Sequence, residues 1–73
     1  MEKKFVLCID DGGYPEALEV RKFYEVREDT EAEREGMVRV IDESGEDYLY
    51  ARDIFLFAEI PPAIREALTA TAL

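Results

Sequence analysis

The sequence of 73 residues contains no histidine and no tryptophan, and Cys8 is its single cysteine. Histidine is the usual general base near neutral pH and a common ligand of zinc, so its absence argues against acid–base catalysis and against a transition-metal site. One cysteine cannot form an internal disulfide, which is typical of a reducing compartment. We therefore expect a cytoplasmic protein without catalytic activity, bound metal or cofactor.

Basic residues and long apolar segments are also scarce. There are 9 Lys and Arg residues against 18 Asp and Glu residues, which gives a net charge of −9 at pH 7. Such a chain is repelled by phosphate backbones and anionic lipids, because both are bound through patches of Lys and Arg. The apolar run at 5–9 is too short for a signal peptide, and no segment reaches the roughly 20 apolar residues of a membrane-spanning helix. We expect neither nucleic-acid binding nor membrane binding.

The apolar residues that are present suffice for one small domain over residues 1–73. Hydrophobic residues make up 48% of the chain and aromatic residues 11%, which favours a packed core over disorder. A domain of this length buries only about 60% of the surface that its unfolded chain exposes. Its margin of stability is therefore expected to be small.

Alternating patterns and turn residues divide the chain into short strands. Residues 22–27 alternate between apolar and charged side chains, as in a half-buried strand. Gly45 suits the left-handed position of a hairpin turn. Pro61 and Pro62 end the last strand, since proline cannot donate a ladder hydrogen bond. We expect strands at roughly 4–9, 22–27, 37–42, 47–51 and 55–60, and a helix at roughly 62–70.

The order of these elements predicts a mainly β protein, a small five-stranded barrel with a short C-terminal helix. Residues 18–26, 38–50 and 51–55 resemble the second strand, the distal hairpin and the last helical turn of SH3-like barrels in small uncharacterised bacterial proteins. Arg21 stands where many of those proteins have a glycine. The resemblance covers roughly residues 5–60 and implies an SH3-like barrel. It implies little about function, because this fold carries unrelated activities.

Two further segments can form helical structure. Residues 28–36 include Thr30 and Glu33 at the spacing of a capping box, but no apolar stripe follows. We expect a loop there, with at most one helical turn. In the C-terminal helix, Ile64 and Leu68 lie one turn apart on one face, and we expect them to cover one open end of the barrel.

The reactive and acidic residues have ordinary structural interpretations. No base is at hand to ionise Cys8, and nearby carboxylates would raise its pKa, so we expect a core cysteine. Asp10 and Asp11 should point to opposite faces of an extended chain, which indicates a solvated strand end before a glycine turn. The hairpin carboxylates at 42, 43, 46 and 47 lack the spacing of an EF-hand, so we expect a solvated acidic turn without a metal ion.

The tyrosines are the candidate binding residues. In SH3-like barrels, ligands often lie between the long first loop and the turn before the last strand. By that resemblance, Tyr14 on the loop and Tyr48 or Tyr50 near the turn would flank a shallow groove, and Asp11 and Glu16 would belong to its acidic rim. Such a groove suits a basic or proline-rich peptide. The alternative is that two or three of these rings are core residues, since aromatic side chains dominate small cores.

The sequence therefore favours a non-catalytic protein- or peptide-binding module of unknown specificity. One alternative is a structural subunit, such as a homodimer formed through a strand edge or the C-terminal helix. Another is an acidic mimic that occupies a nucleic-acid-binding protein. The expected barrel also predicts that Leu49 faces the core, with Tyr48 and Tyr50 pointing outward.

Overall fold

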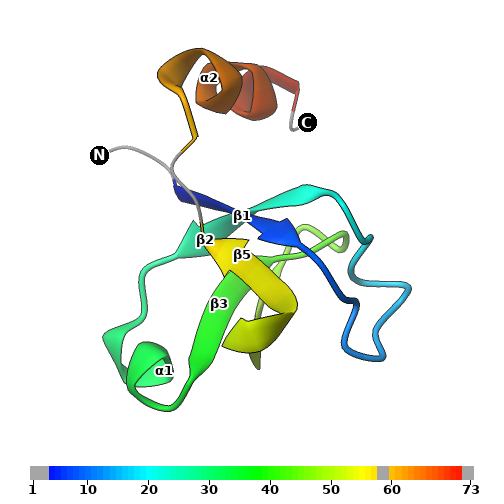
Figure 1. The fold of residues 1–73 in the computed structure, drawn as a ribbon, viewed down its shortest axis with the longest axis vertical. Coiled ribbons are helices and arrows are strands. Elements are labelled where there is room, and N and C mark those ends of the chain that lie inside the picture. The colour runs from blue at the N-terminus through cyan, green and yellow to red at the C-terminus, as the bar shows by residue number, and fades with distance from the viewer. Residues whose placement is uncertain (1–3, 58–59, 72–73) are drawn as a thin grey trace.

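Five short strands and two α-helices make up the computed structural model, which describes residues 4–57 and 60–71 (Figure 1). In chain order the elements are β1 (Lys4–Cys8), β2 (Phe23–Arg27), α1 (Thr30–Arg34), β3 (Met37–Ile41), β4 (Asp47–Ala51), the 3-10 helix η1 (Arg52–Ile54), β5 (Phe55–Phe57) and α2 (Pro62–Thr71). The mainly β class, the five strands and the C-terminal helix are as predicted. The last strand was expected to run to residue 60; β5 ends at Phe57, and residues 58–59 lie outside the described residues.

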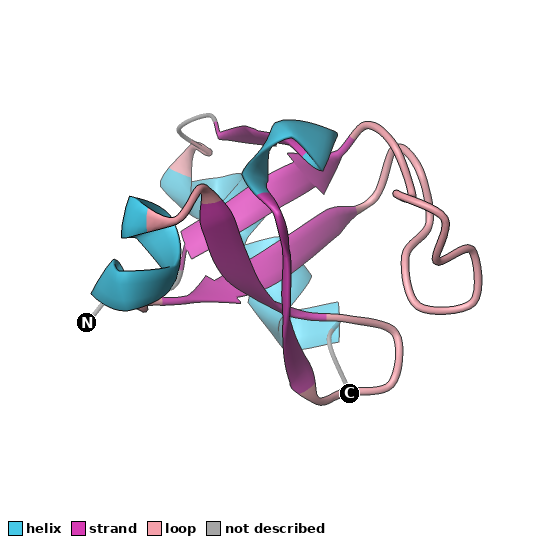
Figure 2. Ribbon diagram, turned by 90° about the horizontal axis from the view of Figure 1, so that it is seen from below, coloured by secondary structure: helices cyan, strands magenta, loops and turns pink. Residues whose placement is uncertain are grey.

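The strands form one antiparallel sheet in the order β4-β3-β2-β1-β5. The first strand lies between β2 and β5, so that Val6 has Tyr24 as its partner on one side and Phe57 on the other. Figure 2 shows that the sheet is strongly twisted, with its strands running in different directions across the view. Among the described residues, the end strands β4 and β5 do not pair with each other, and η1 joins them.

The core occupies one face of this sheet. Its residues come from alternate positions of the strands and from the loop between β1 and β2, as expected for strands with one buried side. The cluster consists of Val6, Cys8, Leu18, Tyr24, Val38, Val40, Tyr50 and Phe55. Cys8 is fully buried within it, so the prediction of a core cysteine is confirmed.

The predicted orientation of β4 is wrong. Leu49 is 44% exposed, whereas Tyr50 is only 6% exposed. The register explains the reversal: Tyr50 lies opposite Val38, which is buried, while Leu49 lies opposite Arg39 on the outer face. Because successive side chains of a strand point to opposite faces, burial of Tyr50 forces Leu49 outward.

The chain enters β2 through a β-bulge at Arg21. Its φ of 73° lies in the left-handed region, which side chains other than glycine rarely adopt. The Arg21 N–H donates to the Cys8 carbonyl at 2.7 Å, and the Cys8 N–H donates to the Lys22 carbonyl at 2.9 Å. Two residues thus face one across the strand pair, the pattern of a bulge that usually carries glycine at its first position. The position where the resemblance implies glycine therefore keeps the glycine conformation.

The segment before β3 contains the short helix α1, which begins at Thr30 and is capped by Asp29. The Asp29 carboxylate accepts a hydrogen bond from the Ala32 N–H at 3.0 Å and another from Arg39 Nε at 2.9 Å. These bonds hold the pKa of Asp29 below its ordinary value, the backbone N–H contributing most. Thr30 is thus the first residue of the helix and not its cap. The five residues of α1 exceed the single turn that was the most expected here.

The helix α2 covers less apolar surface than expected. It lies beyond β1, at the end of the molecule opposite α1 (Figure 1). Ile60 is buried and its carbonyl accepts a hydrogen bond from Arg65 Nη2 at 3.1 Å, but Ile64 is 47% exposed and Leu68 is half-buried. The prediction that Ile64 is covered is therefore wrong, because nearly half of its side chain is open to solvent. Within the described ranges, no helix is long and apolar enough to cross a bilayer.

Candidate functional site

Tyr50 stands at the base of the candidate site and belongs to the core. Its ring makes edge-to-face contacts with Tyr14, at a centroid distance of 5.5 Å, and with Phe55, at 6.2 Å. Aromatic pairs at these distances and angles stabilise beyond the area that they bury. A side chain packed on two sides in this way supports its neighbours and does not itself present a binding surface.

The hydroxyl of Tyr50 is fixed by a buried carboxylate. It donates to Asp42 Oδ2 at 2.5 Å, and the other oxygen, Oδ1, accepts from the Ser44 hydroxyl at 2.5 Å and the Ser44 N–H at 2.9 Å. Burial raises the pKa of Asp42, but the hydrogen bonds from Ser44 and Tyr50 outweigh it and hold the pKa below its ordinary value. Burial, and next the bond to the carboxylate, raise the pKa of the Tyr50 phenol. Asp42 was expected in a solvated turn; that prediction is wrong, because its side chain is only 6% exposed.

Tyr14 is the exposed member of the aromatic pair. It lies in the loop between β1 and β2, and 57% of its surface is open to solvent. Its N–H donates to the Asp11 carbonyl and its own carbonyl accepts from Ala17 and Leu18, so the loop backbone around it forms hydrogen-bonded turns. Leu18 is buried in the core and anchors this loop. The ring is therefore held on the surface by a loop that is packed at both ends.

The loop also lies directly against η1, as the expected position of the groove requires. The Ile9 N–H donates to the Ile54 carbonyl at 2.9 Å, and a Cβ added to Gly12 would lie 3.1 Å from Ile54 Cδ1. Gly12 has a φ of +61°, so both the backbone conformation and the close approach favour glycine at this position. The loop and η1 are thus in contact, and Tyr14 extends from this junction over Tyr50.

Tyr48 is the second exposed ring. It lies two residues before Tyr50 on β4, so both side chains point to the same face of the strand. Tyr48 is 50% exposed because it lies at the hairpin end of an edge strand. We use the term tyrosine face for the surface formed by Tyr14 and Tyr48 with Tyr50 beneath them. Phe23, by contrast, lies beside Leu7 on the opposite face of the sheet and does not contribute to this surface.

The acidic residues assigned to the rim differ in their roles. Asp11 is half-buried, and its Oδ1 accepts the Gly13 N–H at 2.9 Å, while Asp10 accepts the Gly12 N–H in the same manner. The glycine turn after Asp10 is as predicted, whereas the bonds from both carboxylates to its N–H groups were not predicted. Glu16 is exposed on the same loop as Tyr14. The structure therefore brings Tyr14, Asp11 and Glu16 together on one loop, and Tyr14 with Tyr50 in direct contact.

A second tyrosine–carboxylate network stabilises the loop from the other side. The Tyr24 hydroxyl donates to Glu43 Oε2 at 2.5 Å and accepts the Glu19 N–H at 2.7 Å. Lys22 Nζ lies 2.6 Å from the same carboxylate oxygen, and its hydrogen bond is the main reason why the pKa of Glu43 lies below its ordinary value. Asp42 and Glu43 are thus consecutive residues of one hairpin that accept hydrogen bonds from two tyrosine hydroxyls. Tyr50 donates to Asp42 and Tyr24 donates to Glu43. Sequence analysis missed this arrangement, although two acids next to a hairpin glycine were a visible signal.

Cys8 and clusters of possible metal ligands are the remaining candidates for chemistry. The Cys8 thiol donates to the Asp10 carbonyl at 3.2 Å, and burial, together with the charges of Asp11 and Asp10, raises its pKa. A thiol of raised pKa forms little of the thiolate that nucleophilic chemistry needs. In the part of the chain that the structure describes, no group of three or more His, Cys, Asp or Glu side chains is placed to hold a metal ion.

No known protein family, no curated protein and no solved structure matches this chain.

Proposed function

We propose that the protein is a non-catalytic binding module that docks a basic, proline-containing segment of another protein on its tyrosine face. The observation that carries this proposal is the exposure of two aromatic rings, Tyr14 and Tyr48, around a third ring that is buried and immobilised. Large rings presented by a rigid support bind with little loss of conformational entropy. Tyrosine is also among the residues that contribute most to binding at interfaces.

The charge around the tyrosine face supports a basic partner. Glu16 is exposed on the loop of Tyr14, and Glu46 is exposed two residues before Tyr48. Lys22, which follows the loop of Tyr14, is already paired with Glu43 at 2.6 Å. A partner with Lys or Arg next to proline would place apolar rings on the tyrosines and its charges near these carboxylates. Attraction of this kind raises the association rate and the selectivity of binding.

The fold proposed with this function is an SH3-like barrel. Three features support it: the long loop before β2, the hairpin between β3 and β4, and η1 between β4 and β5, each at the position that the sequence resemblance implies. The placement of β1 between β2 and β5 is a fourth, because it brings the first and the last strand together. In this arrangement the loop carrying Tyr14 and the start of η1 lie on one side of the sheet, where a peptide can contact both.

A selection from a random peptide library tests the proposed function. The wild-type protein should enrich peptides rich in Lys, Arg and Pro, and the affinity for a selected peptide should fall between about 0.01 M and about 0.15 M ionic strength as the Debye length shortens. Changing both Tyr14→Ser and Tyr48→Ser should weaken binding at least about tenfold, a loss of about 1.4 kcal/mol. Tyr50 is left unchanged because it is a core residue.

Leu49→Ser is the matched control. Leu49 is exposed to a similar extent on the same strand, but it points to the other face. Its substitution should leave the affinity unchanged. Enrichment of peptides without basic residues, or full binding by the double tyrosine variant, would contradict the proposal. Self-association of the wild-type protein in light scattering, lost on Leu49→Ser, would favour the homodimer instead.

A further inference from the structure

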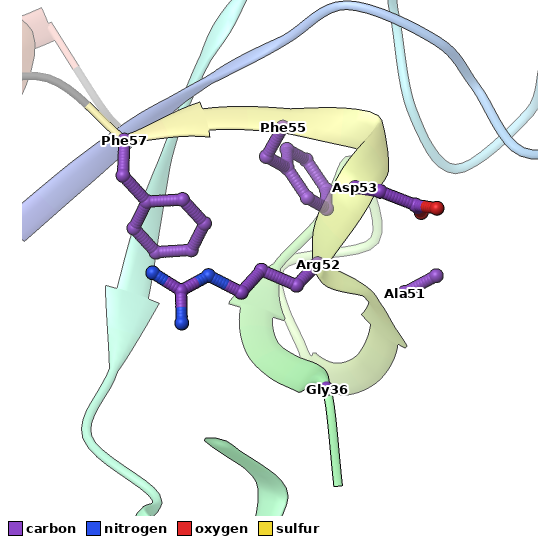
Figure 3. Close-up of a pocket in the computed structure, with 6 residues that line it drawn as sticks. All are labelled: Gly36, Ala51, Arg52, Asp53, Phe55 and Phe57. Atoms are coloured by element: carbon purple, nitrogen blue, oxygen red, sulfur yellow. The ribbon is translucent and has the colours of Figure 1, made fainter. Parts of the chain in front are cut away.

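A second candidate binding surface lies between the start of β3 and the edge strand β5. A hollow of about 500 Å³ is lined there by Gly36, Ala51, Arg52, Asp53, Phe55 and Phe57. In Figure 3 the side chains of Phe55 and Phe57 extend from β5 into this space. The Arg52 N–H donates to the Gly36 carbonyl at 3.0 Å, so the two walls of the hollow are tied together. The hollow is therefore a preformed feature of the fold.

Arg52 gives this hollow its chemical character. Its guanidinium carbon lies 4.6 Å from the centre of the Phe57 ring, which is a cation–π distance. In Figure 3 the side chain extends toward Phe57, whereas the Asp53 carboxylate points away from both. Stacking uses the flat face of a guanidinium and leaves its N–H groups free to donate in the plane. Arg52 is thus held in place without an ion pair to any carboxylate of residues 4–57 or 60–71.

Two other arginines of the protein are engaged differently. Arg39 bonds to Asp29 and lies near Asp47, and Arg65 donates to the Ile60 carbonyl. The chain has twice as many acidic as basic residues. Even so, the Arg52 guanidinium rests on an aromatic ring and not on a carboxylate, so its N–H groups can donate to a ligand. A carboxylate is the ligand that matches the fork of a guanidinium, because two parallel N–H···O bonds can form.

We propose that this hollow binds an acidic side chain, Asp or Glu, of an extended apolar peptide segment from a partner protein. The carboxylate would bond to Arg52, and a neighbouring apolar side chain would lie against Phe57, which is 46% exposed, whereas Phe55 is buried beneath. An extended segment suits the position, because β5 is an end strand of the sheet and end strands offer backbone groups for strand addition. This surface differs in its chemistry from the tyrosine face, which prefers a basic segment.

NMR titration with a short synthetic peptide tests the inference. The probe is acetyl-Val-Glu-Val-Glu-Val-amide, in which the amide end removes the terminal carboxylate. It should shift the Nε–H resonance of Arg52 and the amide resonances of β5. The same peptide with Gln in place of both Glu residues should bind at least about tenfold more weakly, since a charge-assisted pair is lost.

Variants of the protein test the role of Arg52 directly. Arg52→Gln should weaken the acidic peptide at least about tenfold, and Arg52→Lys should also weaken it, because the planar fork and the stacking on Phe57 are lost while the charge is kept. Arg27→Gln, which removes an exposed arginine from β2, is the control and should have no effect. Arg52 is exposed and its bond to Gly36 uses the backbone, so these variants should fold, as their melting temperatures will show.

Three results would overturn the inference. One is an acidic peptide that leaves the Arg52 and β5 resonances unchanged or binds elsewhere. Another is equal binding of the Glu and Gln peptides. The third is unchanged affinity in Arg52→Gln. The probe here is acidic, whereas the proposed function concerns a basic peptide, so failure here would leave the proposed function of the tyrosine face intact.

Discussion

Removing one oxygen atom from Tyr50 tests the central contact of the candidate site. Tyr50→Phe keeps the ring contacts with Tyr14 and Phe55 but removes the hydroxyl that donates to Asp42 at 2.5 Å. The carboxylate is then left buried with one of its oxygens unpaired. Hydrogen bonds to charged groups contribute about 1.5–3 kcal/mol, so we expect a loss of about 2 kcal/mol in the free energy of unfolding. For a domain of this size, that corresponds to a decrease in Tm of about 8–16 °C.

The loss should depend on pH in a defined direction. The folded-state pKa of Asp42 lies below the value of 3.8 for a free aspartate, so its contribution to stability is fully present above that pH. It is lost as the pH falls through the lower, folded-state pKa. The difference between wild type and Tyr50→Phe should therefore be largest near pH 7 and shrink as the pH falls through the folded-state pKa of Asp42, below 3.8, where protonation removes the charge.

Urea denaturation of both proteins at neutral and acid pH measures this difference. Tyr48→Phe is the matched control, because Tyr48 is 50% exposed on the same face of β4, and its loss should stay within about 0.5 kcal/mol. The reasoning is refuted if Tyr50→Phe is as stable as wild type at neutral pH. Equal losses in the two variants would refute it as well, since burial of the bond would then be irrelevant.

Three further experiments test the fold. Leu18→Ala should lower the free energy of unfolding by about 2–5 kcal/mol, because Leu18 is fully buried. Leu49→Ala should lower it by less than about 1 kcal/mol, because Leu49 is exposed on β4. A loss for Leu49→Ala as large as that for Leu18→Ala in urea denaturation would contradict the assigned faces of β4. Arg21→Gly should raise the free energy of unfolding by about 0.5–1 kcal/mol, because glycine adopts the left-handed backbone without strain, whereas Arg27→Gly within β2 should lower it; a less stable Arg21→Gly would argue against the bulge. Cys8 should react with a thiol reagent far more slowly in the native protein than in urea, and rapid native reaction would contradict its burial.

The strands were predictable from the sequence because their signals are local. The strand at 47–51 was expected with the bounds that β4 has, and the alternation of residues 22–27 gave β2 to within one residue. The turn at Gly45 and the start of α2 at Pro62 are likewise properties of single residues. Composition and period therefore suffice for the number and order of strands in a chain this short.

The faces of β4 could not be predicted in this way. A Tyr-Leu-Tyr sequence is compatible with either orientation, since tyrosine has both an apolar ring and a polar end. The decisive partner of Tyr50 is Asp42, eight residues earlier and on the other side of a hairpin turn. Its burial depends on the hydroxyl and N–H groups that surround it, and a hydrophobicity pattern treats it as a solvated turn residue.

The hollow at Arg52 was missed for a related reason. Gly36, Arg52 and Phe57 come from three elements, and no spacing within the sequence marks their proximity. The contact of Arg52 with Phe57 spans η1 and β5 and exists only after the sheet has formed. Sequence analysis did place Tyr14 on the loop that contacts η1, because the resemblance to SH3-like barrels supplied the long-range arrangement.

The most direct test of the proposed function is an NMR map of the surface that contacts a library-selected basic, proline-containing peptide. The largest amide shifts should fall in the loop at 10–19 and at Tyr48, with smaller shifts at Tyr50 because its ring is buried. The same titration of the variant with Tyr14→Ser and Tyr48→Ser should show no saturable binding. A contact surface confined to α2 or to the outer face around Leu49 would contradict the assignment of the tyrosine face as the binding site.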